Sequence, residues 1–192
     1  MNGFIIETND KKKIIDNYVK LNPIFTSKEN NFDIKNNNYD YLQDILNYKL
    51  NKPSYVFKNN ELIKRLTKEN TFFDISIFDD YNHFFNISKS ISIISGKNNI
   101  PLIKCVHNIN IIGILDGEST FYLFNPKHKD EIKEKDNDKI KKWGHKKKLF
   151  KNDILIIPPY WSYIQEIDNK IIQYHIDVDT YFTFIPNFFK DI

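Results

Sequence analysis

The strongest constraint on the fold of this 192-residue chain is a change in its hydrophobic period near Thr71. In residues 11–20 and 39–50, apolar side chains recur at steps of three and four, which is typical of helices that bury one face. From residue 71 onward, apolar and polar residues alternate in short runs, which is typical of strands. The sequence therefore predicts a helical N-terminal portion covering residues 1–70 and a β-rich portion covering residues 71–192.

The β-rich portion divides into short runs that turn residues separate. The expected strands cover residues 73–78, 90–95, 102–107, 109–115, 120–124, 154–157, 163–167 and 171–178. Asp116-Gly117 is interpreted as a tight hairpin turn, because glycine tolerates the positive φ that such turns require. We find no internal repeat and no linker, so we expect a single mainly β domain of the sandwich, barrel or jelly-roll type. Further short elements are expected at residues 4–7 and 55–57 (strands) and 60–66 (a helix).

The amino-acid usage bears on origin and cellular compartment more than on chemistry. The chain has no alanine and a single arginine, Arg65, beside a large excess of Lys, Asn and Ile, which are encoded by AT-rich codons. We therefore expect an AT-rich genome, such as that of a large DNA virus or of certain protists. The net charge of +3 does not by itself imply a polyanionic partner. The one cysteine, Cys105, excludes an intramolecular disulfide and fits a reducing compartment, where we expect it to be a buried, inert thiol.

No segment of the sequence predicts a membrane role. The N-terminus lacks the apolar stretch of a signal peptide, and the longest apolar run, residues 154–159, is far too short to cross a bilayer. We therefore expect an intracellular protein, in the host cytoplasm or in a virion if the source is viral.

Two stretches carry more than a generic strand pattern. Residues 113–126 read GILDGESTFYLFNP and residues 152–163 read NDILIIPPYWSY. In order and spacing they resemble the cupin-like, JmjC-related double-stranded β-helix family, and with the tail at residues 179–188 they are most similar to cupin-like proteins of large nucleocytoplasmic DNA viruses. The resemblance implies a cupin-like jelly roll for the β-rich portion. It also implies a set of positions at which to look for catalytic groups.

Catalytic members of that family bind Fe(II) through a His-x-Asp/Glu pair and a distant His, and they use 2-oxoglutarate. Carried over to this chain, the pair falls at Ile103/Cys105 or Lys104/Val106, the distant His at Tyr163, and the lysine that binds 2-oxoglutarate near Ser119. None of these positions holds the expected group. We therefore expect a non-catalytic, degenerate member that has no catalytic residue, metal or cofactor and acts as a binding or structural module.

Two other interpretations remain open. One is an Fe(II)/2-oxoglutarate oxygenase with displaced ligands, for which His107 and His175 are the first candidates. The other is a small-ligand-binding barrel whose mouth is lined by Tyr122, Trp161 and Tyr163, with the same two histidines nearby. No Cys-x-x-Cys, HExxH, GxSxG or P-loop pattern supports another chemistry.

The polar insert from Lys127 to Lys148 contains the densest basic segment of the chain. Lysines with an aromatic ring among them could contact an anionic partner such as nucleic acid; the candidates are Lys139, Lys141, Lys142, Trp143, Lys146, Lys147 and Lys148. Five acidic residues precede them and offset part of the positive charge of the insert. We interpret it as a solvated loop, with the anionic-partner site as the alternative, and expect a protein partner or a homo-oligomer before nucleic acid.

Overall fold

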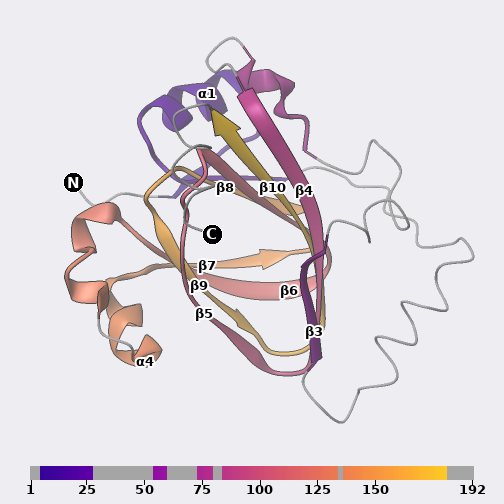
Figure 1. The fold of residues 1–192 in the computed structure, drawn as a ribbon, viewed down its shortest axis with the longest axis vertical. Coiled ribbons are helices and arrows are strands. Elements are labelled where there is room, and N and C mark those ends of the chain that lie inside the picture. Colours follow the sequence, from indigo (N-terminus) through magenta and orange to yellow (C-terminus); the bar gives the residue numbers. More distant parts are fainter. Residues whose placement is uncertain (1–4, 28–53, 60–72, 80–83, 134–135, 181–192) are drawn as a thin grey trace, which may run out of the picture.

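The computed structural model describes residues 5–27, 54–59, 73–79, 84–133 and 136–180. Its strands form a ten-stranded sheet that folds over into two facing layers (Figure 1). The first layer contains β1 (Ile6–Glu7), β2 (Ile24–Ser27), β8 (Asp153–Ile157), the first part of β6 (Ile109–Phe124), β10 (Ile171–Thr180), β4 (Phe84–Ser95) and β3 (Ser54–Asn59). The second contains β5 (Asn98–Lys104), β9 (Ser162–Ile167), the rest of β6 and β7 (His145–Phe150). This confirms the predicted fold class, a β-rich, cupin-like jelly roll.

The long strand β6 joins the two layers and corrects the prediction of a hairpin at Asp116-Gly117. Its first part pairs with β8 and β10, and its second part pairs with β7 and β9, so one continuous strand replaces the two expected ones. Gly117 has φ +85°, and a Cβ there would lie 2.1 Å from the carbonyl oxygen of Lys170. The glycine thus allows a close backbone approach at the corner where β6 passes between layers.

The segment before residue 71 is not only helical. The helix α1 (Lys11–Val19) confirms one predicted helix; Asp10 caps it by accepting a hydrogen bond from the Lys12 amide at 2.9 Å. The same segment also supplies β1, β2 and β3 to the first layer. The expected helices at residues 39–50 and 60–66 lie outside the described residues, as does the end of the tail motif. No helix in the described ranges combines the length and apolar character needed to span a membrane.

The run at residues 73–78 was predicted as a strand and is instead largely a 3-10 helix, η2 (Ile75–Phe78). The Asp74 carboxylate accepts a hydrogen bond from the Ser76 amide, which caps the turn. Phe78 is fully buried, with its ring centroid 4.9 Å from that of Tyr18 on α1. η2 packs with α1 over the outer face of the first layer. Its alternating apolar residues are therefore explained by these contacts and not by pairing in a strand.

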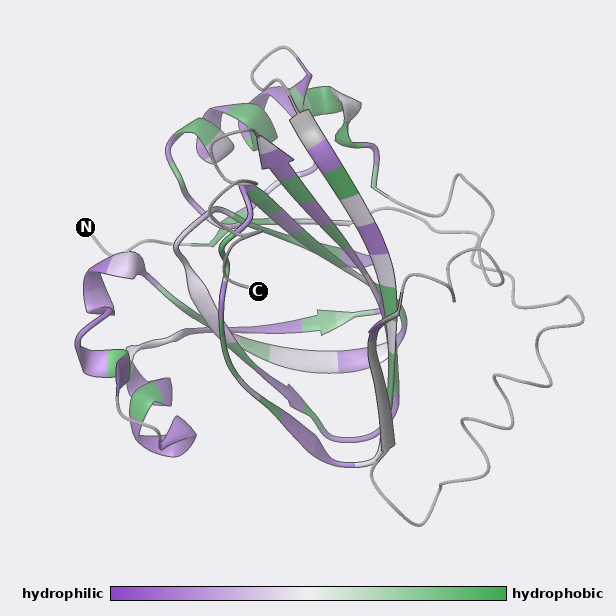
Figure 2. Ribbon diagram, in the orientation of Figure 1, coloured by the Kyte–Doolittle hydropathy of each residue, from purple (hydrophilic) through white to green (hydrophobic). Residues whose placement is uncertain are grey.

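Three apolar clusters fix the orientation of the strands. One covers the outer face of the first layer beneath α1 and η2, a second fills the space between the layers, and a third lies on the outer face of the second layer. Strand β10 shows the alternation: Ile172, Tyr174, Ile176 and Val178 belong to the outer cluster. Figure 2 shows the same alternation of hydropathy along β4. The intervening residues of β10 therefore face the interior, and most of them are polar.

The insert is ordered, which corrects its interpretation as a solvated loop. It contains the short helices η3 (Pro126–His128), η4 (Glu131–Lys133), α4 (Asn137–Ile140) and η5 (Lys141–Trp143), and it ends in strand β7. Ile132 and Ile140 are buried in the third apolar cluster, against Phe124 and Ile164 of the second layer. The insert is thus a cover for that face, and Figure 1 shows α4 beside the barrel.

Candidate functional site: a cavity between the two layers

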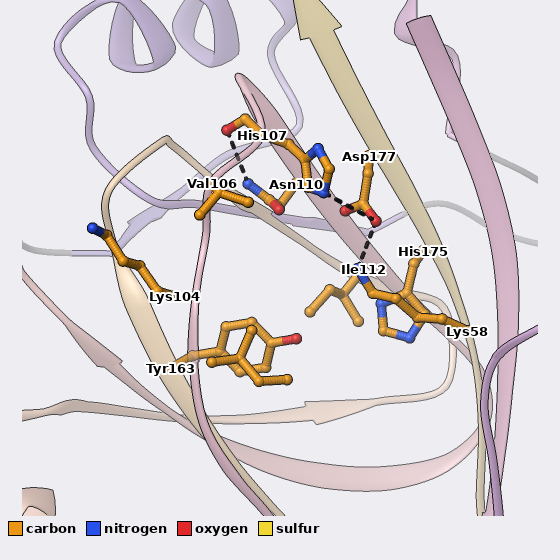
Figure 3. Close-up of a pocket in the computed structure, with 10 residues that line it drawn as sticks. Lys58, Lys104, Val106, His107, Asn110, Ile112, Tyr163, His175 and Asp177 are labelled. Carbon is orange, nitrogen blue, oxygen red and sulfur yellow. Dashed lines mark hydrogen bonds and ion pairs between the residues drawn. The ribbon is translucent and has the colours of Figure 1, made fainter. Parts of the chain in front are cut away.

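A cavity of about 210 Å³ lies between the two layers (Figure 3). Its polar lining residues are Lys58, Lys104, His107, Asn110, Tyr163, His175 and Asp177, and its apolar ones are Ile103, Val106 and Ile112. They come from β3, β5, β6, β9 and β10 and from the segment that follows β5. Cavities that hold drug-sized molecules are usually about 300 Å³ or larger, so this cavity suits a smaller molecule.

Lys58 reaches the cavity because β3 bulges. The pairing of β3 with β4 shifts register between Val56 and Asn59, and Lys58 has φ +48°, a conformation that is strained for a residue with a side chain. Its amide donates to Ser92 Oγ at 2.9 Å, and its Nζ donates to Asp177 Oδ2 at 2.5 Å. These two bonds hold the strained residue with its ammonium group directed at the cavity wall.

The imidazole ring of His107 lies between the carboxylates of Asp177 and Asp179. His107 Nδ1 lies 2.9 Å from Asp179 Oδ2, and His107 Nε2 lies 4.0 Å from Asp177 Oδ2. Asn110 Nδ2 fixes the backbone of His107 by donating to its carbonyl oxygen at 3.3 Å. Among the described residues, none forms a hydrogen bond with the second, buried oxygen of Asp179. The carboxylates at and behind the wall therefore hold more acceptor capacity than the described donors satisfy.

His175 is held neutral on the inner face of β10. Burial is the main cause that lowers its pKa to about 3. Its Nε2 lies 2.9 Å from Ser92 Oγ and 3.2 Å from Gln173 Nε2. Because an amide nitrogen can only donate, Nε2 is the acceptor and the proton resides on Nδ1. Gln173 also exchanges two hydrogen bonds with Gln165, so His175 belongs to a buried network.

The phenol of Tyr163 points into the cavity (Figure 3). Its ring packs against Phe121 at a centroid distance of 5.7 Å, and no residue in the described part of the chain forms a hydrogen bond with its hydroxyl group. Burial raises its pKa well above the usual value, so the hydroxyl stays protonated. The neighbouring Cys105 is buried and burial raises its pKa as well, which confirms the prediction of a buried thiol.

The structure brings together only part of the predicted ligand pocket. His107, Tyr163 and His175 line the cavity, and so do Ile103 and Lys104, two of the positions at which the sequence resemblance placed metal ligands. Trp161 and Tyr122 do not line it, which corrects the prediction for those two residues.

Local structure explains why Trp161 and Tyr122 do not line the cavity. Trp161 precedes β9 and is buried beside the cavity, where its Nε1 donates to the Leu21 carbonyl oxygen at 3.0 Å. Tyr122 lies on the outer face of β6, because its neighbours Phe121 and Leu123 face the interior. Its hydroxyl group donates to Glu166 at 3.0 Å, and neither residue lines the cavity.

Sequence reasoning missed Lys58, Asn110, Asp177 and Asp179. The two aspartates could have been found, since they follow His175 at steps of two and therefore share its face of β10. Lys58 carries no comparable signal, because it reaches the cavity through the bulge in β3.

Most of the candidate lysines of the insert form ion pairs with nearby carboxylates. Four of the six candidates form ion pairs: Lys139 with Asp136, Lys141 with Asp138 and Glu166, Lys147 with Glu7, and Lys148 with Glu118. Lys142 and Lys146 lie over the rings of Trp143 and Tyr122. Partial burial acts to raise the pKa of Glu166, but hydrogen bonds from Lys141 and Tyr122 outweigh it and lower that pKa. The segment is thus a charge-compensated surface.

The donor groups around the cavity do not fit Fe(II). His175 Nε2 faces Ser92 and Gln173, and His107 Nδ1 faces Asp179. In the part of the chain that the structure describes, no three His, Cys, Asp or Glu side chains are grouped to hold a metal ion. A 2-His-1-carboxylate site needs three such ligands with open positions, and these side chains are committed to one another.

Comparison with known proteins gives similarity at the level of structure alone. No protein-family model matches the sequence, and no curated protein sequence matches it. Similar crystal structures include salicylate 1,2-dioxygenase from Pseudaminobacter salicylatoxidans (TM-score 0.36, 9% identity, 47% of this chain and 20% of that one). Others are the 11S allergen of Cocos nucifera (0.38, 8%, 49% and 23%) and procruciferin, an 11S globulin of Brassica napus (0.38, 11%, 48% and 21%). The aligned part spans about a fifth of each of these proteins.

Proposed function

We propose that this protein is a non-catalytic, cupin-like binding module that holds a small molecule in the cavity between its two layers. The observation that carries the proposal is the cavity wall itself. Lys58, His107, Asn110 and Asp177 project from four different segments onto one space of about 210 Å³. Convergence of a few polar groups on a partly apolar cavity is the usual form of a small-molecule site.

The energetics of the wall support a role in binding. Asp177 and Asp179 are nearly buried, and removing a carboxylate from water is costly unless its hydrogen-bonding capacity is satisfied. Lys58 adds backbone strain to this cost, and strained residues concentrate at functional sites. An interior that served only packing would be more stable with apolar residues at these positions. A bound ligand accounts for the retained polar groups.

The same donor set argues against the displaced-ligand oxygenase, since His175 Nε2 is engaged with Ser92 and Gln173 and His107 Nδ1 is engaged with Asp179. The motif resemblance to cupin-like proteins of large DNA viruses and the amino-acid usage typical of an AT-rich genome support a viral origin and an intracellular location. The proposed protein is thus viral and intracellular, and it associates with a protein partner or with a second copy of the chain.

A thermal-shift screen tests the proposal. Wild-type protein and Val106→Phe, which fills the cavity from its apolar side, would be screened against sugars, amino acids, carboxylates, amines and nucleobases. A ligand that binds only the folded state raises the melting temperature, so at least one class should stabilise the wild type and not Val106→Phe. The matched control is Ile87→Phe, which places the same ring at an exposed position of β4. Equal stabilisation of all three proteins, or of none, would reject the cavity as a binding site.

A further inference from the structure

We infer that the ligand of this cavity is a small zwitterion with a branched aliphatic group, of the kind presented by an aliphatic α-amino acid. The inference rests on the proposed function, because it concerns the same cavity. It follows from which hydrogen-bonding groups of the wall remain uncommitted, from how close the opposite charges lie, and from the apolar side of the cavity.

The wall offers uncommitted donors and acceptors side by side. Lys58 Nζ has three hydrogens and one partner, and the Tyr163 hydroxyl has no partner in the described part of the chain. On the acceptor side, the described residues leave one oxygen of Asp177 and the side-chain oxygen of Asn110 without donors. Figure 3 shows these groups facing one space, whereas the amino group of Lys104 points away from it.

The spacing of the charges selects against a ligand with a single charge. Lys58 Nζ and Asp177 Oδ2 are only 2.5 Å apart. A carboxylate that approached Lys58 would therefore meet Asp177, and an ammonium that approached Asp177 would meet Lys58. Like charges in a desolvated site are strongly unfavourable. A zwitterion satisfies both partners, with its carboxylate toward Lys58 and Tyr163 and its ammonium toward Asp177 and Asn110.

The apolar residues that line the cavity favour an aliphatic group over a polyol. They are Ile103, Val106 and Ile112, and they present branched side chains. A sugar bound there would leave hydroxyl groups buried without partners, whereas a branched aliphatic group would bury apolar surface at a gain of roughly 25 cal/mol per Å². The charge-assisted hydrogen bonds of a zwitterion are also stronger than those of neutral hydroxyls.

Calorimetric titration with four probes tests the inference on the full chain. L-leucine carries both charges, 4-methylpentanoate only the carboxylate, 3-methylbutylamine only the ammonium, and glucose represents the polyols. We expect leucine to bind at least about tenfold more tightly than each of the other three, a difference that one charge-assisted contact can supply.

Two substitutions should change the selectivity in opposite directions. Asp177→Asn removes the repulsion of a carboxylate, so 4-methylpentanoate should gain affinity relative to leucine. Lys58→Met removes the repulsion of an ammonium, so 3-methylbutylamine should gain. Tyr163→Phe, which deletes one hydroxyl group, should weaken leucine and 4-methylpentanoate and leave the amine unchanged. Tyr122→Phe, on the outer face of β6, is the control and should alter none of the affinities.

The outcomes separate this inference from the proposed function. Leucine binding no more tightly than the singly charged probes, or selectivity that does not switch between Asp177→Asn and Lys58→Met, would overturn the zwitterion. Glucose or a singly charged probe that binds as tightly as leucine, in a way that Val106→Phe abolishes, would also overturn it, while leaving the cavity as a binding site. If no probe here and no class in the wider screen bound in a way that Val106→Phe abolishes, both would fail.

Discussion

The cavity wall and the insert both place lysines beside carboxylates, but they do so under different conditions. In the insert, the pair between Lys148 and Glu118 lies on the surface, with side chains 43% and 46% exposed. In the cavity, Asp177 is 10% exposed and its partner Lys58 is 31% exposed. Exposed pairs contribute little to stability and are screened by salt, whereas buried polar groups are costly when unsatisfied. The difference indicates that burial and incomplete pairing, rather than charge density in the sequence, mark the site.

The largest effect expected at neutral pH lies in the buried network next to the cavity. Gln173→Ala should lower the free energy of unfolding by roughly 3 kcal/mol, because it leaves the buried side-chain oxygen of Gln165 without its donor, removes one partner of His175 and creates a void. Urea unfolding followed by circular dichroism measures this. Lys142→Ala in the insert is the control and should change the free energy by no more than about 0.5 kcal/mol. Similar losses for both variants would remove the distinction between the two regions.

The second effect is a dependence of stability on pH that originates at His175. Its pKa of about 3 in the folded protein lies below the ordinary value of 6.5, so between these values the unfolded chain binds the extra proton. Stability should therefore fall as the pH drops from 6.5 toward 3, with this group contributing up to about 1.4 kcal/mol per pH unit. Comparing urea unfolding of wild type and His175→Gln across this range isolates the contribution. Parallel curves would show that His175 is not held neutral by burial.

A matched pair of substitutions sharpens the comparison at equal bond length. Lys58→Met and Lys148→Met each remove an ammonium from an ion pair, of 2.5 Å and 2.6 Å respectively. We expect Lys58→Met to cost about 1–2 kcal/mol, since it leaves Asp177 nearly buried without its partner, and Lys148→Met to cost no more than about 0.5 kcal/mol. Chemical denaturation at low and high salt provides the measurement. A larger loss of stability for Lys148→Met than for Lys58→Met would contradict the assignment of the site to the cavity.

The smallest expected effect on stability concerns the end of the basic segment. Replacing Lys146, Lys147 and Lys148 by alanine should shift the melting temperature little, because these side chains lie on the edge strand β7 and their pairs are at least partly exposed. If the insert contacts an anionic partner, the same change should weaken heparin or nucleic-acid binding and flatten its dependence on salt. Heparin affinity that the triple substitution leaves unchanged would reject this surface as the contact.

The sequence predicted those parts of the fold that follow from a local period. The alternation along β10 and the arrest of β8 before Pro158-Pro159 are properties of neighbouring residues, and the structure has both. The corner at Gly117 was interpreted as a hairpin because the same dipeptide serves both purposes. Only the partners of β6 in the two layers decide between them. The 3-10 helix η2 was missed because its apolar residues pack under α1, a tertiary contact that no local period encodes.

The candidate site was predictable to the extent that its residues occupy regular strands. Tyr163 and His175 were identified from their strand positions, and both line the cavity. Tyr122 was placed on the wrong face because the direction of alternation along β6 was not known. Lys58 required a register shift that only the pairing of β3 with β4 reveals.

The most direct test of the central claim is an amide-proton and nitrogen NMR titration with L-leucine. If the cavity is the binding site, the resonances of residues 103–112, Tyr163, His175 and Asp177 should shift, and those of residues 139–148 in the insert should remain in place. Shifts confined to the insert would contradict the account. So would the absence of any shift at saturating L-leucine, if a different small molecule shifted the resonances of the insert.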